Sequence, residues 1–175
     1  DMKINGEFVS GVESWVSLSV MKTEEDIVGD FISNTDGSTT EAGYIPRPTD
    51  QRVNFSMFFQ DYIPGNPNYK MHLNLVYGTG LSFGPPKGEK YQNILRIPDY
   101  RRVDIGFSAV LKPEDRKSKL KWLNIFNSIW ISAEVFNLLD INNTVSYLWV
   151  ADITGRQYAV PNYLTARQIN TKLIL

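Results

Sequence analysis

Apolar and polar residues alternate along most of this 175-residue chain, and no other feature restricts its fold as strongly. Successive side chains of a β-strand point to opposite faces of a sheet, so a period of two predicts strands with one apolar and one polar face. The alternation predicts seven strands, at 2–8, 12–22, 51–63, 69–78, 100–112, 127–139 with a continuation to 151, and 166–175. No segment has a convincing helical stripe. The chain is therefore expected to be all-β.

The predicted strands are long and their polar faces are charged. Most have about 9–12 residues, whereas strands of globular sheets usually have about 5–6 and strands that cross a bilayer about 9–11. The polar faces carry Lys70, His72, Asn74, Asp104, Glu134, Asn170 and Lys172. Alternation alone fits both a soluble sandwich and a barrel with a wet lumen. Strand length favours the membrane barrel, with an apolar exterior.

The connections between the strands alternate in length. Short turns are predicted at Ser10–Gly11 and Pro64–Pro67, and a medium one at 113–126. Long loops are predicted at 23–50, 79–99 and 152–165. Outer-membrane barrels have short periplasmic turns and longer external loops, and this sorting again favours a barrel.

The composition excludes several classes of protein. The chain has no cysteine, which rules out disulfides, a thiol nucleophile and Cys-based metal sites. A net charge of −1 argues against a nucleic-acid-binding surface. Because His72 is the only histidine, no metal cluster with a second histidine can be built. His72 lies on the polar face of its strand, where a hydrogen-bonding residue of a lumen is favoured over a catalytic one. We therefore expect no enzyme, no catalytic residue and no cofactor.

Several segments resemble one family, the TonB-dependent outer-membrane receptors of the type found in Bacteroidetes, in their C-terminal strands. Glu134–Asp140 is similar to that family's Glu-x-x-Asn-Leu-Phe-Asp box in the penultimate strand. The other similar segments are 7–22, 64–69 as a periplasmic turn, 77–85 entering a surface loop, 101–106 as a strand entry and 160–167 before the last strand. Their order and spacing cover the chain from about residue 50 to its end.

The resemblance implies that residues 1–175 are the last seven or so strands of an antiparallel, up-and-down transmembrane barrel of about 22 strands. The plug domain and most of the barrel are missing, and the chain stops at Leu175 where the family normally ends on an aromatic residue, so we expect a fragment. Such a receptor lies in the outer membrane of a Gram-negative bacterium and imports a scarce nutrient with energy relayed by TonB. The implied partners are outer-membrane lipid, the remaining barrel and plug, and TonB through the absent N-terminal region. The resemblance does not decide whether a surface lipoprotein forms a lid over the barrel.

The same topology makes the loops 23–50, 79–99 and 152–165 extracellular. We expect ligand contacts from their aromatic and polar side chains, namely Tyr44, Arg47, Tyr91, Gln92, Asn93, Arg156, Tyr158 and Asn162. The residues do not specify the ligand.

Loop 23–50 also holds seven acidic residues against one basic residue, Arg47. Residues 34–38 resemble a calcium-loop core, but Ile32 occupies the position where a preceding ligand is needed, and no glutamate closes a twelve-residue loop. A solvated loop is therefore favoured over a cation contact, and no metal site is predicted.

A second hypothesis comes from another class of protein. A soluble β-sandwich, such as a carbohydrate-binding or adhesion module, would show the same alternation and would place the aromatic residues in its core or at a sugar-binding face. It predicts a monomer that is soluble without detergent.

Overall fold

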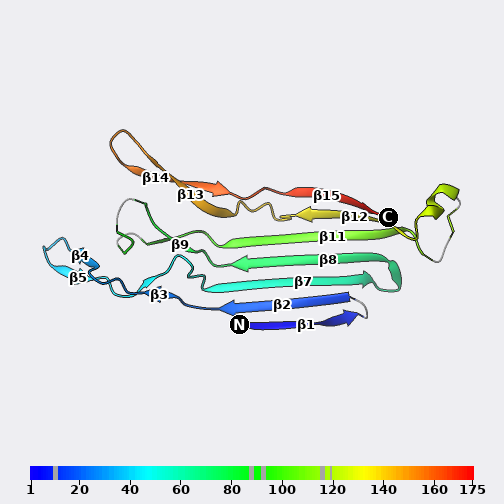
Figure 1. Ribbon diagram of the computed structural model, residues 1–175, viewed down its shortest axis with the longest axis horizontal. Helices are drawn as coiled ribbons and strands as arrows, with labels where there is room; N and C mark the ends of the chain where they lie inside the picture. Colours follow the sequence, from blue (N-terminus) through cyan, green and yellow to red (C-terminus); the bar gives the residue numbers. More distant parts are fainter. Residues whose placement is uncertain (10–11, 87–88, 92–93, 115–116, 119) are drawn as a thin grey trace.

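The computed structural model describes residues 1–9, 12–86, 89–91, 94–114, 117–118 and 120–175, and its main feature is one seven-stranded antiparallel sheet. The order of its strands is β1-β2-β7-β8-β11-β12-β15, so each strand lies beside the sheet strand before and after it in the sequence (Figure 1). The bounds are β1 (Met2–Val9), β2 (Val12–Val20), β7 (Val53–Ile63), β8 (Asn66–Gly78), β11 (Tyr100–Lys112), β12 (Ile129–Phe136) and β15 (Gln168–Ile174). The seven predicted strands and the all-β, antiparallel class are confirmed.

Eight further strands of the described chain form four two-stranded sheets outside the main one. They are β3 (Glu24–Glu25) with β6 (Ile45–Pro46), β4 (Phe31–Ser33) with β5 (Thr39–Glu41), β9 (Ser82–Phe83) with β10 (Leu95–Arg96), and β13 (Thr144–Ala151) with β14 (Gln157–Tyr163). One 3₁₀ turn, η1 (Lys121–Ile125), lies between β11 and β12. The predicted continuation of the 127–139 strand to 151 is wrong, because β12 ends at Phe136 and residues 144–163 form a separate hairpin.

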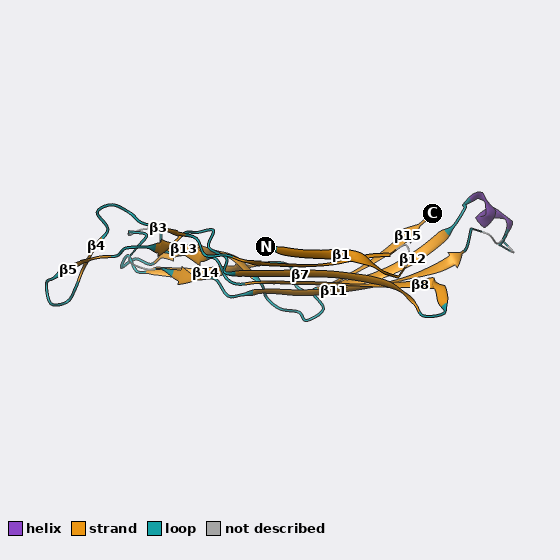
Figure 2. Cartoon of the chain, turned by 90° about the horizontal axis from the view of Figure 1, so that it is seen from below, coloured by secondary structure: helices purple, strands orange, loops and turns teal. Residues whose placement is uncertain are grey.

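The main sheet is a single curved layer with two open edges (Figure 2). Within the described chain, β1 pairs only with β2 and β15 pairs only with β12, so the sheet does not close into a barrel. A search of the described residues for a helix long and apolar enough to cross a membrane found none.

The two faces of the sheet differ sharply in chemistry. Register pairs such as Leu73 with Ile105 put apolar side chains on one face, and pairs such as Asn74 with Asp104 put polar side chains on the other. Many apolar-face residues are between 37% and 77% exposed: Met2, Ile4, Met71, Ile105, Phe107, Ile131, Ile169 and Leu173. The only apolar residues found buried in the described chain are Val12, Ile45 and Ile129. The sheet therefore has no packed core on its apolar side.

The connections sort by length to the two ends of the sheet (Figure 1). At the loop end lie the long connections 21–52, 79–99 and 137–167, and at the turn end lie the connections 64–65 and 113–128. The predicted parity of short and long connections is confirmed. The turn between β7 and β8 has only Pro64 and Gly65, with Gly65 at φ 77°, as a type II turn requires. The predicted turn at Ser10–Gly11 lies outside the described residues.

Candidate functional site

A buried carboxylate joins two of the long connections at the loop end. Asp50 is completely buried and accepts hydrogen bonds from the Thr23 N–H at 2.8 Å and from Arg52 Nε at 3.0 Å. The Arg96 guanidinium contacts the same carboxylate and also donates to the carbonyls of Asp50 and Gly80, each at 3.0 Å. Connection 21–52 is thereby fixed to connection 79–99.

The environment of Asp50 keeps it ionised. Burial alone would raise the pKa of the carboxyl group, but the hydrogen bond from Thr23 and those from Arg96 and Arg52 outweigh burial. The pKa of Asp50 is consequently held well below its usual range. The link between the two connections is therefore charge-assisted at neutral pH.

Two asparagines attach the third connection to the sheet. Asn143 is buried, and its side chain accepts from the Arg101 N–H and donates to the Arg101 carbonyl, both at 2.8 Å. Asn137 follows β12 with φ 52°, a left-handed conformation that asparagine tolerates better than most residues. Its N–H donates to Asp104 at 2.8 Å and its side chain donates to the Ile141 carbonyl at 3.0 Å. These bonds account physically for the asparagine in the Glu134–Asp140 segment.

Aromatic rings hold the second and third connections together. Phe83 on β9 stacks on Tyr147 of β13, with ring centroids 4.5 Å apart and an interplanar angle of 6°. Trp149, also on β13, lies 6.2 Å from Phe83 in a tilted arrangement. The three long connections thus form one continuous surface, which we call the loop-end surface (residues 21–52, 79–99 and 137–167).

A pocket of about 370 Å³ opens on this surface between β3, β6 and β9. Its lining is mostly apolar and comprises Glu25, Ile45, Pro46, Pro48, Ser82, Phe83, Gly84, Pro85, Pro86, Glu89, Lys90 and Ile94. The buried Ser82 hydroxyl has no hydrogen-bond partner. A concave apolar site with a few polar groups suits a small ligand or a ligand side chain.

Those predicted ligand contacts that the structure describes lie on the loop-end surface but are not among the residues that line this pocket. Tyr44 is 73% exposed beside β6, and Arg47 lies 3.5 Å from Glu25. Tyr91 is half-buried, while Gln92 and Asn93 lie outside the described residues. The other three lie on or beside the hairpin of β13 and β14: Arg156, Tyr158 and Asn162. The lining of the pocket was missed because it depends on contacts between Pro- and Gly-rich segments that have no periodic signal.

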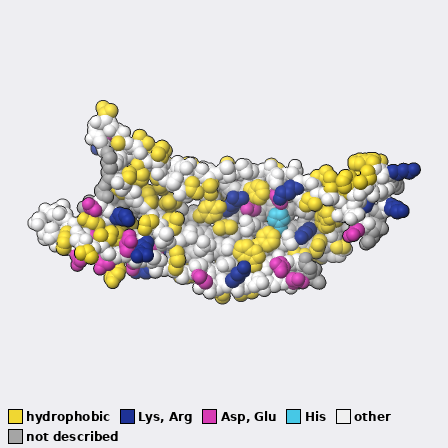
Figure 3. Space-filling model, viewed as in Figure 1, with side chains coloured by type: hydrophobic (Ala, Val, Ile, Leu, Met, Phe, Trp, Pro, Cys, Tyr) yellow, Lys and Arg dark blue, Asp and Glu magenta, His cyan; other side chains and the backbone are white. Residues whose placement is uncertain are grey.

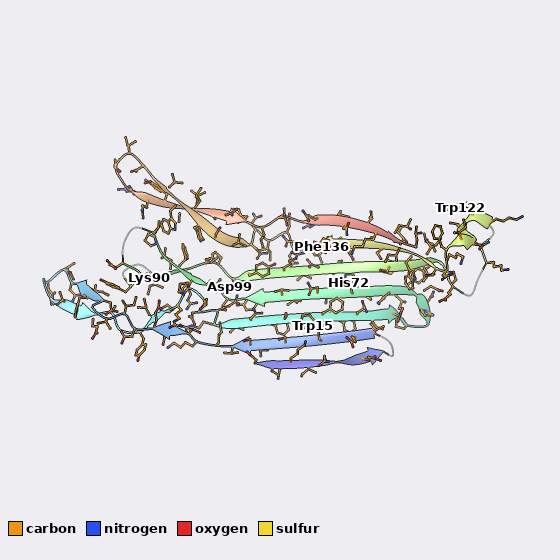
Figure 4. The ribbon with its side chains drawn as sticks, in the orientation of Figure 1. Trp15, His72, Lys90, Asp99, Trp122 and Phe136 are labelled. Atoms are coloured by element: carbon orange, nitrogen blue, oxygen red, sulfur yellow. The ribbon has the colours of Figure 1, made fainter. Side chains whose placement is uncertain are left out.

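The polar face of the sheet carries a second ordered feature, a row of side chains that crosses the strands in register. Lys3 Nζ lies 5.8 Å from the Trp15 ring, Trp15 stacks on Phe58 at 6.4 Å, and Phe58 lies 6.1 Å from His72. Figure 4 shows Trp15 and His72 on neighbouring parts of this face, and Figure 3 shows the histidine among basic and acidic side chains.

The row continues beyond His72 across Gly106. A side-chain Cβ at Gly106 would meet the His72 imidazole, which therefore lies directly over this glycine. Glu134 is the register partner of Gly106 on the next strand, and it binds Lys172 Nζ at 2.8 Å and Asn170 Nδ2 at 3.1 Å. We call the side chains from Lys3 to Lys172 the cross-sheet row. Within the row, Glu134 forms an ion pair with Lys172, Lys3 lies over the Trp15 ring, and Trp15 stacks on Phe58.

Carboxylates offer the one set of metal ligands that the described residues bring together. The ligand oxygens of Asp26, Asp30 and Glu41 all lie within 4.8 Å of one another, in connection 21–52. The prediction that the chain has no catalytic residue stays a prediction.

Comparison of the chain with protein-family models, with curated proteins and with solved structures gave no match. The geometry of the sheet and of its loop end must therefore carry the functional argument.

Proposed function

We propose that this chain is a segment of the barrel wall of an outer-membrane TonB-dependent receptor, whose loop-end surface contributes to the mouth that captures a scarce nutrient. The observation that carries the proposal is the bare apolar face of a single-layered sheet. Exposed residues such as Phe107, Ile131 and Leu173 form a continuous apolar surface where a soluble protein would pack a second layer.

The strand lengths suit a bilayer. β8 and β11 each have 13 residues, so each extends about 43 Å at about 3.3 Å per residue. At a tilt of about 35–45° this length projects to about 30–35 Å, which exceeds the apolar band of about 25 Å that barrels present to lipid. Both strands are therefore long enough to cross the membrane.

The distribution of charge is consistent with lipid on one face and water on the other. Asp104 pairs with Arg102 at 2.7 Å and accepts from Asn74 at 3.2 Å, all on the polar face. Charges facing lipid cost about 2–4 kcal/mol at the midplane and about 0–1 near the interfaces. Asp61, an acidic residue on the apolar face, is the register partner of Met71 near the end of β7, where this cost is lower than at the midplane.

The open edges also suit a piece of a larger cylinder. β1 and β15 each have one side without a paired strand among the described elements, and a barrel closes such edges with further strands. The alternative β-sandwich requires a second sheet over the apolar face. The four small sheets do not meet this need, because they are formed by connections at the loop end.

The remaining functions follow from this proposal. Lipid surrounds the apolar face, and the rest of the barrel pairs with β1 and β15. A plug relays energy from TonB, and a surface lipoprotein would contact the loop end. The pocket beside Phe83 and the exposed Tyr44 are then the parts of this chain that face an incoming ligand.

Single-cysteine spin labelling of the full-length protein in lipid vesicles tests the proposal. Residues 1–175 contain no cysteine, so within them the label attaches only to the cysteine that is introduced. Leu73→Cys and Asn74→Cys are matched, because they are adjacent in the middle of β8 and lie on opposite faces. The label at 73 should collide with lipid-dissolved oxygen, and the label at 74 with a water-soluble nickel chelate. Labels at Lys70 and Met71 should repeat the alternation.

Two results would overturn the proposal. A label at Leu73 that is inaccessible to both reagents would mean that a protein layer covers the apolar face, as in a sandwich. A label at Leu73 that is accessible only to the nickel chelate would place this face in water.

A further inference from the structure

At the tip of connection 21–52, the carboxylates of Asp26, Asp30 and Glu41 have no ion-pair partner among the described residues. This tip consists of residues 26–30 and the β4–β5 hairpin, and it is the part of the connection that lies farthest from the main sheet (Figure 1). Asp26 and Asp30 precede β4, and Glu41 is the last residue of β5. The hairpin joins them, because Phe31 pairs with Glu41 and the Ala42 N–H donates to the Asp30 carbonyl at 2.9 Å.

Asp30 is the unusual member of this group. Its side chain is completely buried, and neither of its carboxylate oxygens has a hydrogen-bond partner. An ionised carboxylate removed from water without a partner is strongly unfavourable, so a buried one is normally paired with a cation or coordinates a metal. The basic side chains of this connection bind other acidic residues, since Lys22 pairs with Glu24 and Arg47 with Glu25.

The spacing of the oxygens fits one metal ion. Ligand atoms of Asp26, Asp30 and Glu41 lie within 4.8 Å of one another. Two oxygens bound to one calcium ion at about 2.3–2.6 Å can be at most about 5 Å apart, so ligand atoms within 4.8 Å of one another can share one calcium ion. Three carboxylates supply up to six oxygens, and exposed positions at Asp26 and Glu41 leave room for water to complete a calcium shell.

We propose that Asp26, Asp30 and Glu41 bind a calcium ion that fixes the β4–β5 hairpin to the segment before it. The ion supplies the counter-charge that Asp30 lacks and ties residues 26–30 to the end of β5. This site depends on the geometry of connection 21–52 alone, so it goes beyond the proposed function and does not require the sheet to lie in a membrane.

The test is calcium binding to the full-length protein after removal of divalent ions with a chelator. Titration calorimetry should show one additional calcium ion bound per chain, with a dissociation constant of about 0.1–1 mM, as in extracellular calcium modules. Asp30→Asn, Asp26→Asn and Glu41→Gln should each weaken this site by at least about tenfold, because loss of even an outer partner of a metal ligand weakens binding by about 10–100-fold. Asp36→Asn is the matched control, since Asp36 is an exposed carboxylate of the same hairpin that bonds only to Ser38 among the described residues. The calcium affinity of this variant should stay within about twofold of the wild-type value.

Hydrogen exchange provides a readout that does not depend on calorimetry. Calcium should slow exchange of the amides in residues 26–33 and 39–43 of the wild type and of the Asp36→Asn control, but not of the Asp30→Asn variant. Absence of calcium binding in the wild type would overturn the proposal. Equal binding by the Asp30→Asn variant, or binding of magnesium in preference to calcium, would overturn it as well. Because the spin-label experiment reports on Leu73 and this one on connection 21–52, either proposal can fail alone.

Discussion

Gly106 is the position where the cross-sheet row can be tested most sharply. A Cβ built there would lie 2.5 Å from His72 Nε2 and 2.8 Å from Nδ1, whereas non-bonded heavy atoms are at their optimum near about 3.5–4.0 Å. His72 Cε1 would lie closer still, so the imidazole would have to withdraw by more than about 1 Å, and its contact with the Phe58 ring, at 6.1 Å between centroids, would change. We therefore expect Gly106→Ala to force the row apart.

The magnitude follows from two opposing terms. Overpacking costs about 1–3 kcal/mol, whereas replacing a strand glycine by alanine recovers about 0.5–1 kcal/mol of conformational entropy. Gly106→Ala should therefore destabilise the protein by up to about 2.5 kcal/mol when His72 is present. In a His72→Ala background the clash is gone, and the same change should stabilise the protein by about 0.5–1 kcal/mol.

The assay is urea unfolding of the full-length protein in detergent for the wild type, both single variants and the double variant. The reversal of sign between the two backgrounds is the diagnostic result, and it corresponds to a coupling free energy of about 1–3 kcal/mol. If Gly106→Ala lowers the free energy of unfolding equally in both backgrounds, the imidazole does not lie over Gly106, and the reasoning fails.

Three further predictions concern the loop end. Asp50→Asn should destabilise connection 79–99 by about 1–3 kcal/mol, because Arg96 loses its charged acceptor and is itself partly exposed, and faster hydrogen exchange there should report it. Since the pKa of Asp50 is depressed in the folded state, the difference between wild type and this variant should be constant above about pH 5 and should shrink only as the pH falls further; a difference that shrinks between pH 7 and 5 would contradict this sign. Asn137→Ala should cost about 1–2 kcal/mol more than Asn137→Gly in urea unfolding, because only glycine adopts the left-handed backbone freely, and equal costs would exclude that cause. Phe83→Ala should speed exchange of β13 by removing about 0.5–1.5 kcal/mol of stacking on Tyr147, whereas Phe83→Tyr should not.

The period-two signal predicted the main sheet well because each strand buries few apolar side chains and has one apolar and one polar face. Val103, Ile105 and Phe107 fall on one face, and Arg102, Asp104 and Ser108 on the other, with no tertiary contact needed to assign them. The order of the strands also follows from the sequence, since antiparallel neighbours in the chain are neighbours in the sheet.

The loop end was less predictable because its structure depends on distant partners. The stacking of Phe83 on Tyr147 joins residues 64 positions apart, and the bonds of Asp50 to Arg96 join residues 46 apart. The β13–β14 hairpin had a local sequence signal that was missed, namely Gly155. This glycine lies in the turn between the two strands and adopts φ 83°. The carboxylates at 26, 30 and 41 match no calcium-loop spacing, and only the pairing of Phe31 with Glu41 brings the last of them near the first two.

The contrast between two-residue turns and long connections also sets an order of assembly. Connection 21–52 is about sixteen times as long as the turn Pro64–Gly65, so closing it costs about 2.5 kcal/mol more chain entropy, at about 0.6 kcal/mol per doubling. β7 and β8 should therefore pair as an early hairpin, before either strand finds its partner across a long connection. The sheet would then grow by docking hairpins that are already formed, and mutations in the long connections should slow this later step while leaving the first hairpin intact.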